Sequence, residues 1–218
     1  MDKKLYKRVR EAKLGQRQMP APLGHLSAWI AEKYDVRVVY IESDRLKGPP
    51  SHGRRRLQIF LDTGADYYRV HEDHCELKPH VRDEVSQQVV KLMAEAPGEK
   101  ADWDKVHIVF SDFSEDAKSQ ALQKFMEKES KRLRKELARD RVDNLVCAGD
   151  LFIFYKDDAD VRRFAADGTS ERIRQLCYQR VMPYDEFGYL QPESFTVVFD
   201  SKENLDRNYK GSLFYYLK

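Results

Sequence analysis

The residues that could most directly do chemistry lie at the end of an apolar segment, where Asp62, Thr63 and Gly64 follow "LQIFL". A carboxylate that leaves a strand into a small Thr-Gly turn can approach a second carboxylate closely. Two aspartates that share one proton across a water molecule can act as general acid and general base. The segment therefore raises the hypothesis of an aspartic-type hydrolase with Asp62 as its catalytic group.

The longer stretch "FLDTGAD", residues 60–66, resembles the catalytic loop of retropepsins. The resemblance implies a second aspartate of the same kind, which those small β-rich enzymes take from an identical subunit. This chain has no second Asp-[Ser/Thr]-Gly triplet, because Asp167, Gly168 and Thr169 carry the letters in another order. Asp and Gly also favour turns for backbone reasons of their own. We therefore interpret the segment around Asp62 as a turn between two strands.

A second enzymatic hypothesis uses Asp66, Glu76 and Lys78, which follow the D…ExK order of a metal-dependent nuclease. Carboxylates on neighbouring strands would hold Mg²⁺, and the lysine would steady the attacking water or the phosphate. Such triplets also arise by chance in a chain that is 35% charged. The nuclease and the aspartic-type hydrolase remain the alternatives to a binding function.

The letters "HEDHC" suggest a zinc site built from His71, His74 and Cys75. On a strand, however, residues 71 and 75 share one face and His74 points to the other. Three ligands so arranged do not converge on one ion, which needs a tetrahedral set. We expect neither a bound metal nor a cofactor.

The overall charge is nearly balanced, with 39 Lys and Arg against 37 Asp and Glu. Such a chain lacks the basic field that draws proteins to nucleic acid or anionic lipid, so the composition argues against both partners. No apolar run approaches the roughly 18 residues of a membrane span. The three cysteines lie far apart without a CxxC pair, which favours reduced thiols in a cytoplasmic protein. Cys147 and Cys177 lie in apolar segments and are expected to react slowly.

The sequence predicts three parts: a basic arm at residues 1–24, an N-terminal half at 25–97 and a C-terminal half at 98–218. The arm carries Leu5 and Val9 at the spacing of an amphipathic helix, and the Pro- and Gly-containing stretch "APGEKADWD" separates the halves. Each half combines an early helix, paired strands and a packing helix. We predict an α+β fold with antiparallel sheets packed by helices. Whether the halves are related, or form one continuous domain, stays open.

The expected elements of the N-terminal half are a helix at 24–34, strands at 36–43, 56–62 and 67–71, and a helix at 79–96. Those of the C-terminal half are a strand at 105–113, a long helix capped by Ser114, strands at 143–148 and 150–156, a helix at 169–185, a strand at 194–199, a helical turn at 200–211 and an aromatic strand at 212–217.

The second half shows a strand "WDKVHIVF", a charged helix, the strand "GDLFIFYKDD", a further helix and the segment "YDEFGYLQPE". This order, over residues 103–193, resembles that of YezG-type bacterial antitoxins. The resemblance implies a cytosolic immunity protein that binds and blocks a nuclease toxin and that carries no catalytic residues. We therefore expect the partner to be another protein, a toxin domain being one such partner.

Two local charge patches could hold such a partner, since the long-range field nearly cancels. One is the acidic segment with Asp157, Asp158 and Asp160, which we expect to be an exposed loop attractive to a basic toxin. The other is the helix face with Lys131, Arg134 and Lys135.

Overall fold

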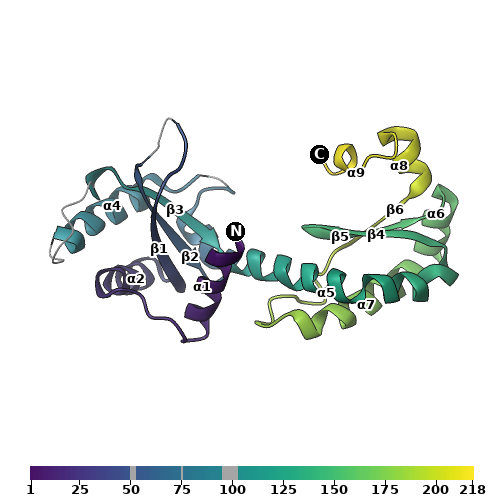
Figure 1. Ribbon diagram of the computed structural model, residues 1–218, viewed down its shortest axis with the longest axis horizontal. Helices are drawn as coiled ribbons and strands as arrows, with labels where there is room; N and C mark the ends of the chain where they lie inside the picture. The colour runs from purple at the N-terminus through teal and green to yellow at the C-terminus, as the bar shows by residue number, and fades with distance from the viewer. Residues whose placement is uncertain (50–52, 75, 95–102) are drawn as a thin grey trace. The chain divides into compact units, whose positions relative to one another are not determined.

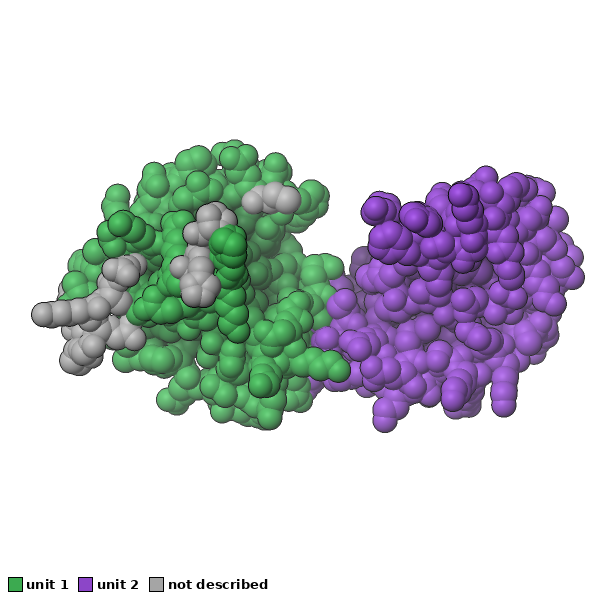
Figure 2. All heavy atoms as spheres, turned by 45° about the horizontal axis from the view of Figure 1, so that its top comes forward, with its two compact units in different colours: residues 1–116 green, residues 117–218 purple. Residues whose placement is uncertain are grey.

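The chain forms two compact units, which the computed structural model describes over residues 1–49, 53–74, 76–94 and 103–218. Unit 1 is Met1–Asp116 and unit 2 is Ala117–Lys218 (Figure 2). Each unit holds one three-stranded sheet packed with helices, which confirms the α+β prediction. The units divide inside a long helix and not at the predicted position, residues 97 and 98, which lies outside the described ranges.

Unit 1 contains, in order, α1 (Lys3–Lys13), α2 (Ala21–Tyr34), β1 (Val38–Arg45), β2 (Arg55–Leu61), α3 (Gly64–Val70), α4 (Pro79–Ala94), a 3₁₀ turn η1 (Trp103–Lys105) and β3 (His107–Asp112) (Figure 1). The sheet order is β1-β2-β3. The pair β1 and β2 is antiparallel as predicted, and β3 lies parallel to β2, so the sheet is mixed.

Unit 2 is built from α5 (Phe113–Leu137), η2 (Ala138–Asp140), β4 (Val142–Ala148), β5 (Asp150–Tyr155), α6 (Asp158–Ala166), α7 (Thr169–Val181), η3 (Met182–Tyr184), β6 (Val197–Ser201), α8 (Lys202–Tyr209) and α9 (Leu213–Tyr216). Helix α5 begins at the end of unit 1 and continues through unit 2. The sheet order is β4-β5-β6, with β4 antiparallel and β6 parallel to β5.

The two units share one topology. In each, a helix leads into an antiparallel strand pair, two helices follow, and a third strand lies parallel to the middle strand. The registers also match: Val38 pairs with Leu61 in unit 1 as Val142 pairs with Tyr155 in unit 2. An irregularity in the pairing follows each of these pairs at the same place. The two hairpins therefore share their register and the place at which it shifts.

The core of unit 1 lies between one face of its sheet and helices α2 and α4. The strands contribute alternate apolar side chains, as expected for a face of period two: Ile41, Leu57, Ile59, Leu61 and Phe110. The opposite face of β1 lies against α1, whose Arg8 binds Glu42 at 3.1 Å. Leu5 and Val9 are buried, so the predicted arm is an amphipathic helix that belongs to unit 1.

The core of unit 2 lies between its sheet and helices α5 and α7. Its buried side chains include Phe125, Leu133, Ile153, Ile173 and Cys177. The other face of β5 carries Phe152 and Phe154, and the ring of Tyr216 from α9 packs edge-on against both, at centroid distances of 6.0 and 5.3 Å. Helix α9 is therefore held on the sheet by an aromatic cluster.

Two predicted strands are wrong. Residues 67–70 lie in α3, because Thr63 and Asp66 form a capping box that starts a helix shortly after β2, and only His71, which follows the helix, is extended. Residues 213–216 form the short helix α9, which Ser212 and Leu217 flank, and the amide of Tyr216 donates to the carbonyl of Ser212. Short apolar runs do not distinguish strand from helix by periodicity. Ser114 is not the cap of α5 but lies in its first turn, since α5 begins at Phe113.

The thiols of Cys147 and Cys177 are unpaired, and burial raises the pKa of both, that of Cys177 to about 12. Because the thiolate is the reactive form, we expect Cys177 to remain unlabelled by a thiol reagent at pH 8 until the protein unfolds. Cys147, which is only partly buried, should react slowly. Labelling of a Cys75→Ser variant, followed by mass spectrometry with and without urea, measures both rates. Rapid native labelling of Cys177 would contradict this packing.

Candidate functional site

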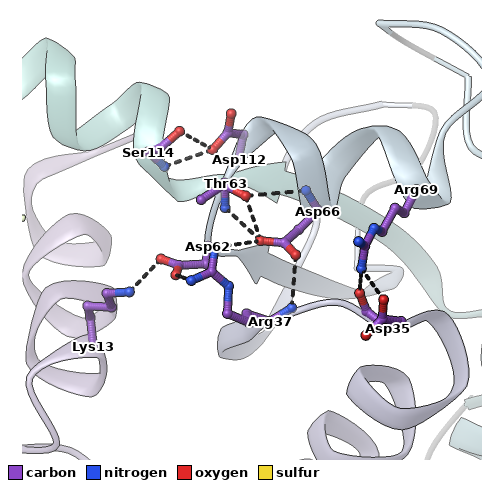
Figure 3. A network of polar contacts seen from close by, with 9 residues as sticks. All are labelled: Lys13, Asp35, Arg37, Asp62, Thr63, Asp66, Arg69, Asp112 and Ser114. Atoms are coloured by element: carbon purple, nitrogen blue, oxygen red, sulfur yellow. Dashed lines mark hydrogen bonds and ion pairs between the residues drawn. The ribbon is translucent and has the colours of Figure 1, made fainter. Parts of the chain in front are cut away.

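The strongest polar cluster of unit 1 lies where the parallel strands β2 and β3 end (Figure 3). Asp62 follows β2 directly and Asp66 lies in the first turn of α3. Arg37 precedes β1, and Lys13 is the last residue of α1. Chain segments that are distant in sequence therefore bring two carboxylates and two cations together.

Asp62 is 3% exposed and binds both cations. Its carboxylate lies 2.6 Å from Lys13 Nζ and 3.2 Å from Arg37 Nη1. Its amide donates to the carbonyl of Arg37 at 2.9 Å, so the backbone fixes the same pair. Asp62 thus connects α1, the start of β1 and the end of β2.

Asp66 is 6% exposed and accepts hydrogen bonds from two residues. The amide and the hydroxyl of Thr63 donate to its Oδ2 at 3.2 and 2.7 Å, while Thr63 Oγ1 accepts from the amide of Asp66 at 3.3 Å. Arg37 donates its backbone amide to Oδ1 at 3.3 Å and places Nη2 3.5 Å from Oδ2. A carboxylate in the first turn is also favoured by the helix dipole.

The same helix is tied to the preceding segment a third time. Arg69 Nη1 binds the carboxylate of Asp35 at 2.6 Å and also donates to the Asp35 carbonyl. Asp35 adopts a left-handed conformation, φ 52°, as the residue that ends α2. The chain between α2 and β1 is thus held against α3 at two residues, Asp35 and Arg37 (Figure 3).

The geometry of Asp62 differs from that of a proton-sharing dyad. In a dyad two carboxylates face one another across a water molecule. Here Asp62 and Asp66 both contact the guanidinium of Arg37. Asp62 does so through Oδ2, and its other oxygen, Oδ1, binds Lys13. The cluster therefore works as an ion network that joins elements. Our interpretation of Asp62 as a turn between strands is corrected in one respect: the turn joins a strand to a helix.

Gly64 explains why the letters Asp-Thr-Gly occur. A Cβ at Gly64 would lie 3.1 Å from Oδ2 of Asp112, the last residue of β3. Asp112 Oδ1 accepts from the amide and hydroxyl of Ser114 at 2.8 and 2.7 Å. The glycine leaves room for this neighbouring carboxylate, and its position needs no catalytic reason.

The proposed nuclease set is not brought together. Asp66 is buried at the start of α3, whereas Glu76 is exposed beyond the end of that helix and its amide donates to Asp73 at 2.8 Å. Lys78 Nζ donates to the carbonyl of Arg69 at 2.8 Å. A Mg²⁺ site needs its carboxylates around one point, and these side chains point to different partners.

The histidines near α3 are engaged by tyrosines. His71 is buried, its ring stacks on Tyr67 at 3.7 Å, and its Nδ1 lies 3.0 Å from the Tyr67 carbonyl. His74 Nδ1 lies 2.6 Å from the hydroxyl of Tyr68. Cys75, the third predicted zinc ligand, lies outside the described residues. Among the residues that are described, no group of three or more His, Cys, Asp or Glu could hold a metal ion.

Unit 2 repeats the ion network of unit 1 at equivalent positions. Arg141 directly precedes β4 as Arg37 precedes β1, and it binds Asp160 at 2.5 Å and Asp157 at 2.7 Å. Asp157 caps α6, and Asp160, in its first turn, is 3% exposed and also binds Arg163 at 2.7 Å. The prediction of an exposed acidic loop is wrong, because these residues start a helix and Asp160 is buried.

Asp158, the third residue of that segment, is also paired. It accepts from the hydroxyl of Ser201 and lies 2.5 Å from Arg207 Nη2. Ser201 ends β6 at the position that Asp112 occupies at the end of β3. The other predicted partner-binding residues, Lys131, Arg134 and Lys135, are exposed on α5, where Arg134 donates to Asn144 at 2.5 Å.

Sequence reasoning missed the two arginines that organise these networks. A signal was present: "TGAD" at 63–66 and "DDAD" at 157–160 both place a capping residue three positions before an aspartate. An Arg-Val pair precedes each first strand, at Arg37 and Arg141. The two patterns together could have indicated the repeat.

A second candidate surface lies on α9. Phe214, Tyr215 and Leu217 are 66, 60 and 40% exposed, while Tyr216 points inward and donates its hydroxyl to Asp200 at 2.7 Å. We call the three exposed side chains the α9 surface. The neighbouring helix α8 carries charged side chains of both signs, which form ion pairs such as Lys202 with Asp206. An aromatic centre beside a charged border is typical of protein interfaces.

No family model, curated protein or solved structure matches this chain. Within the described ranges, no helix is long and apolar enough to cross a membrane.

The equivalent aspartates of the two networks should carry equivalent stability. Asp66→Ala and Asp160→Ala each remove a buried carboxylate that lies in the first turn of a helix and binds an arginine. We expect a loss of about 2 kcal/mol in the free energy of unfolding, below the usual cost of breaking a buried pair. The reason is that the Arg37 and Arg141 side chains are 69 and 47% exposed and can be hydrated. Urea unfolding measures this, with the exposed Glu32→Gln as control. Losses no larger than that of the control would show the networks to be incidental.

Stability should also fall in mild acid because of His71. Burial lowers the pKa of His71 below its ordinary value of 6.5. The unfolded chain therefore binds more protons than the folded chain below about pH 6.5, so the free energy of unfolding decreases as the pH falls through that value. His71→Phe keeps the stacking on Tyr67 but cannot titrate. Its unfolding free energy should change less between pH 7 and pH 5 than that of the wild type, and equal slopes would refute the assignment.

Proposed function

We propose that the protein acts by binding another protein, as an immunity protein that neutralises a toxin, and that the α9 surface anchors this partner. The α9 surface is the observation that carries the proposal. Contiguous exposed aromatic side chains are uncommon on isolated proteins and mark contact sites. Phe and Tyr at the centre of an interface supply large contact areas at low conformational cost.

The way α9 is held supports this role. Tyr216 packs against Phe152 and Phe154 and binds Asp200, so the helix is fixed on the sheet while its neighbours face outward. A preorganised anchor loses less freedom on binding than a mobile one. The ion pairs of α8 would form the polar rim of such an interface.

The ion networks favour binding over the alternative hydrolase functions. Asp62 and Asp66 are engaged by Lys13, Arg37 and Thr63 within unit 1. The element order of residues 103–193, which resembles YezG-type immunity proteins, supports a toxin as the partner. The predicted cytoplasmic location agrees with a protein that meets its partner inside the cell.

The test uses the purified products of the genes adjacent to that of this protein, with binding measured by biosensor and neutralisation by growth in co-expression. We expect one product to be toxic alone and harmless with the wild-type protein. The double variant Phe214→Ala/Tyr215→Ala should weaken the complex at least about tenfold, since central aromatic residues dominate binding energy.

Tyr68→Ala is the matched control, because Tyr68 is an exposed aromatic residue of unit 1 at 48%. It should leave the affinity unchanged. An equal loss in both variants, or no loss in the double variant, would refute the α9 surface as anchor. Absence of any binding or neutralisation would refute the proposed function itself.

The hydrolase alternative has its own test. We expect the purified protein to cleave neither a peptide library nor nucleic acid in the presence of Mg²⁺. Cleavage that disappears in Asp62→Asn or in Asp66→Asn, with the variants shown to be folded by circular dichroism, would establish the enzyme instead.

A further inference from the structure

One end of the sheet of unit 1 gathers cationic side chains from four segments. We call the "basic end" the exposed cations at the end of β1, at the start of β2, before β3 and on α4: Arg45, Lys47, Arg54, Arg82 and Lys105. The pairing of β1 with β2 and of β2 with β3 makes these segments neighbours. Arg54 Nε also donates to the carbonyl of Lys105 at 2.6 Å, which fixes two of them together.

No described residue of unit 1 neutralises the charges of the basic end. Arg45 and Arg54 donate to the carbonyls of Gly53 and Lys105, which leave a cation's charge in place. Over the described ranges, none of the five side chains of the basic end forms an ion pair. Arg56, next to them, is neutralised by Asp44 through two bonds of 2.8 and 2.6 Å.

The ring of His107 reports the resulting positive field. His107 is the first residue of β3 and pairs in register with Arg56. Its pKa is lowered first by burial and then by the positive charges of Arg54, Arg56 and Arg82. Two members of the basic end, Arg54 and Arg82, therefore act on the same ring, although they come from different segments of the chain.

We propose that the basic end is a docking surface for an acidic polypeptide segment, rich in Asp and Glu, of a partner protein. The proposal is independent of the α9 surface, which belongs to unit 2. Guanidinium groups bind carboxylates through paired hydrogen bonds, and Arg56 with Asp44 already shows this arrangement at the edge of the site.

Two features favour carboxylates over nucleic acid. The aromatic ring at this end, Trp103, is 6% exposed and lies under Arg55 at 4.1 Å, so it offers no face on which a base could stack. The net charge of the whole chain is only +2, which gives little long-range attraction for a polyanion. Local contacts with a short acidic segment need no such field.

The test is a titration with a fluorescent deca-glutamate peptide, followed by anisotropy at 50 and 200 mM NaCl. We expect binding at 50 mM that weakens at least about fivefold at 200 mM, as for exposed charge pairs that salt screens. The triple variant Arg45→Gln/Lys47→Gln/Arg54→Gln should bind at least about tenfold more weakly. A fluorescent dT10 oligonucleotide should bind more weakly than the peptide.

The matched control is Lys124→Gln/Lys128→Gln/Arg132→Gln, which removes the same number of exposed cations from α5. It should change the affinity for the peptide less than about twofold. If both triple variants lose affinity equally, attraction is a matter of net charge and the proposal fails. It also fails if dT10 binds more tightly than the peptide, or if the peptide does not bind at 50 mM NaCl.

A second variant, Arg45→Gln/Lys47→Gln/Lys105→Gln, keeps the Arg54 side chain and guards against a folding defect in the first. It should show the same loss of affinity as the first. The imidazole pKa of His107, followed by NMR, should rise when the peptide binds, because carboxylates favour the protonated ring. An unchanged His107 titration at saturating peptide would place the peptide elsewhere and overturn the proposal.

Discussion

An arginine placed before the first strand of each sheet binds the aspartate in the first turn of the helix that follows the second strand. Arg37 with Asp66 and Arg141 with Asp160 occupy equivalent positions, and both carboxylates are almost fully buried. A buried carboxylate without a cation is costly, so each pair requires the chain before β1 or β4 to lie against the helix after β2 or β5. The ion pair thereby holds the hairpin, the helix after it and the chain before it together. The parallel third strand pairs with the middle strand of this arrangement.

The two networks differ in a compensating way at the junction between the start of the helix and the end of the third strand. In unit 1 a glycine, Gly64, leaves room for the longer side chain of Asp112 at the end of the third strand. In unit 2 the position of Gly64 holds Asp158, and the position of Asp112 holds the shorter Ser201, which donates a hydrogen bond to it. Each junction therefore holds one carboxylate. The third strand supplies it in unit 1, as Asp112, and the helix supplies it in unit 2, as Asp158. The triplet at 62–64 that suggested an aspartic-type hydrolase is one of the two solutions.

Local patterns predicted most of the elements, because amphipathic helices and apolar strands carry their own periodicity. The helix predicted from residue 79 and the two strands predicted at 143–148 and 150–156 are confirmed as α4, β4 and β5. The patterns failed where a side-chain contact decided the outcome. Thr63 and Asp66 start a helix that includes residues 67–70, and Tyr216 holds the helix at 213–216 against a sheet. Arginines that act across many residues leave no periodic signal, so neither network could be read from one local segment.

The nearly neutral composition also conceals how the charges are distributed. Buried aspartates of the networks are matched by arginines within their own unit, and these pairs contribute to the residue counts but little to the field outside. The cations of the basic end have no such match in the described structure, and the α9 surface is apolar. The charge and polarity of the exposed surface are therefore determined by the side chains that take no part in the ion networks. Because each unit neutralises its buried aspartates internally, the same arrangement of elements can carry a basic surface on one unit and an aromatic surface on the other.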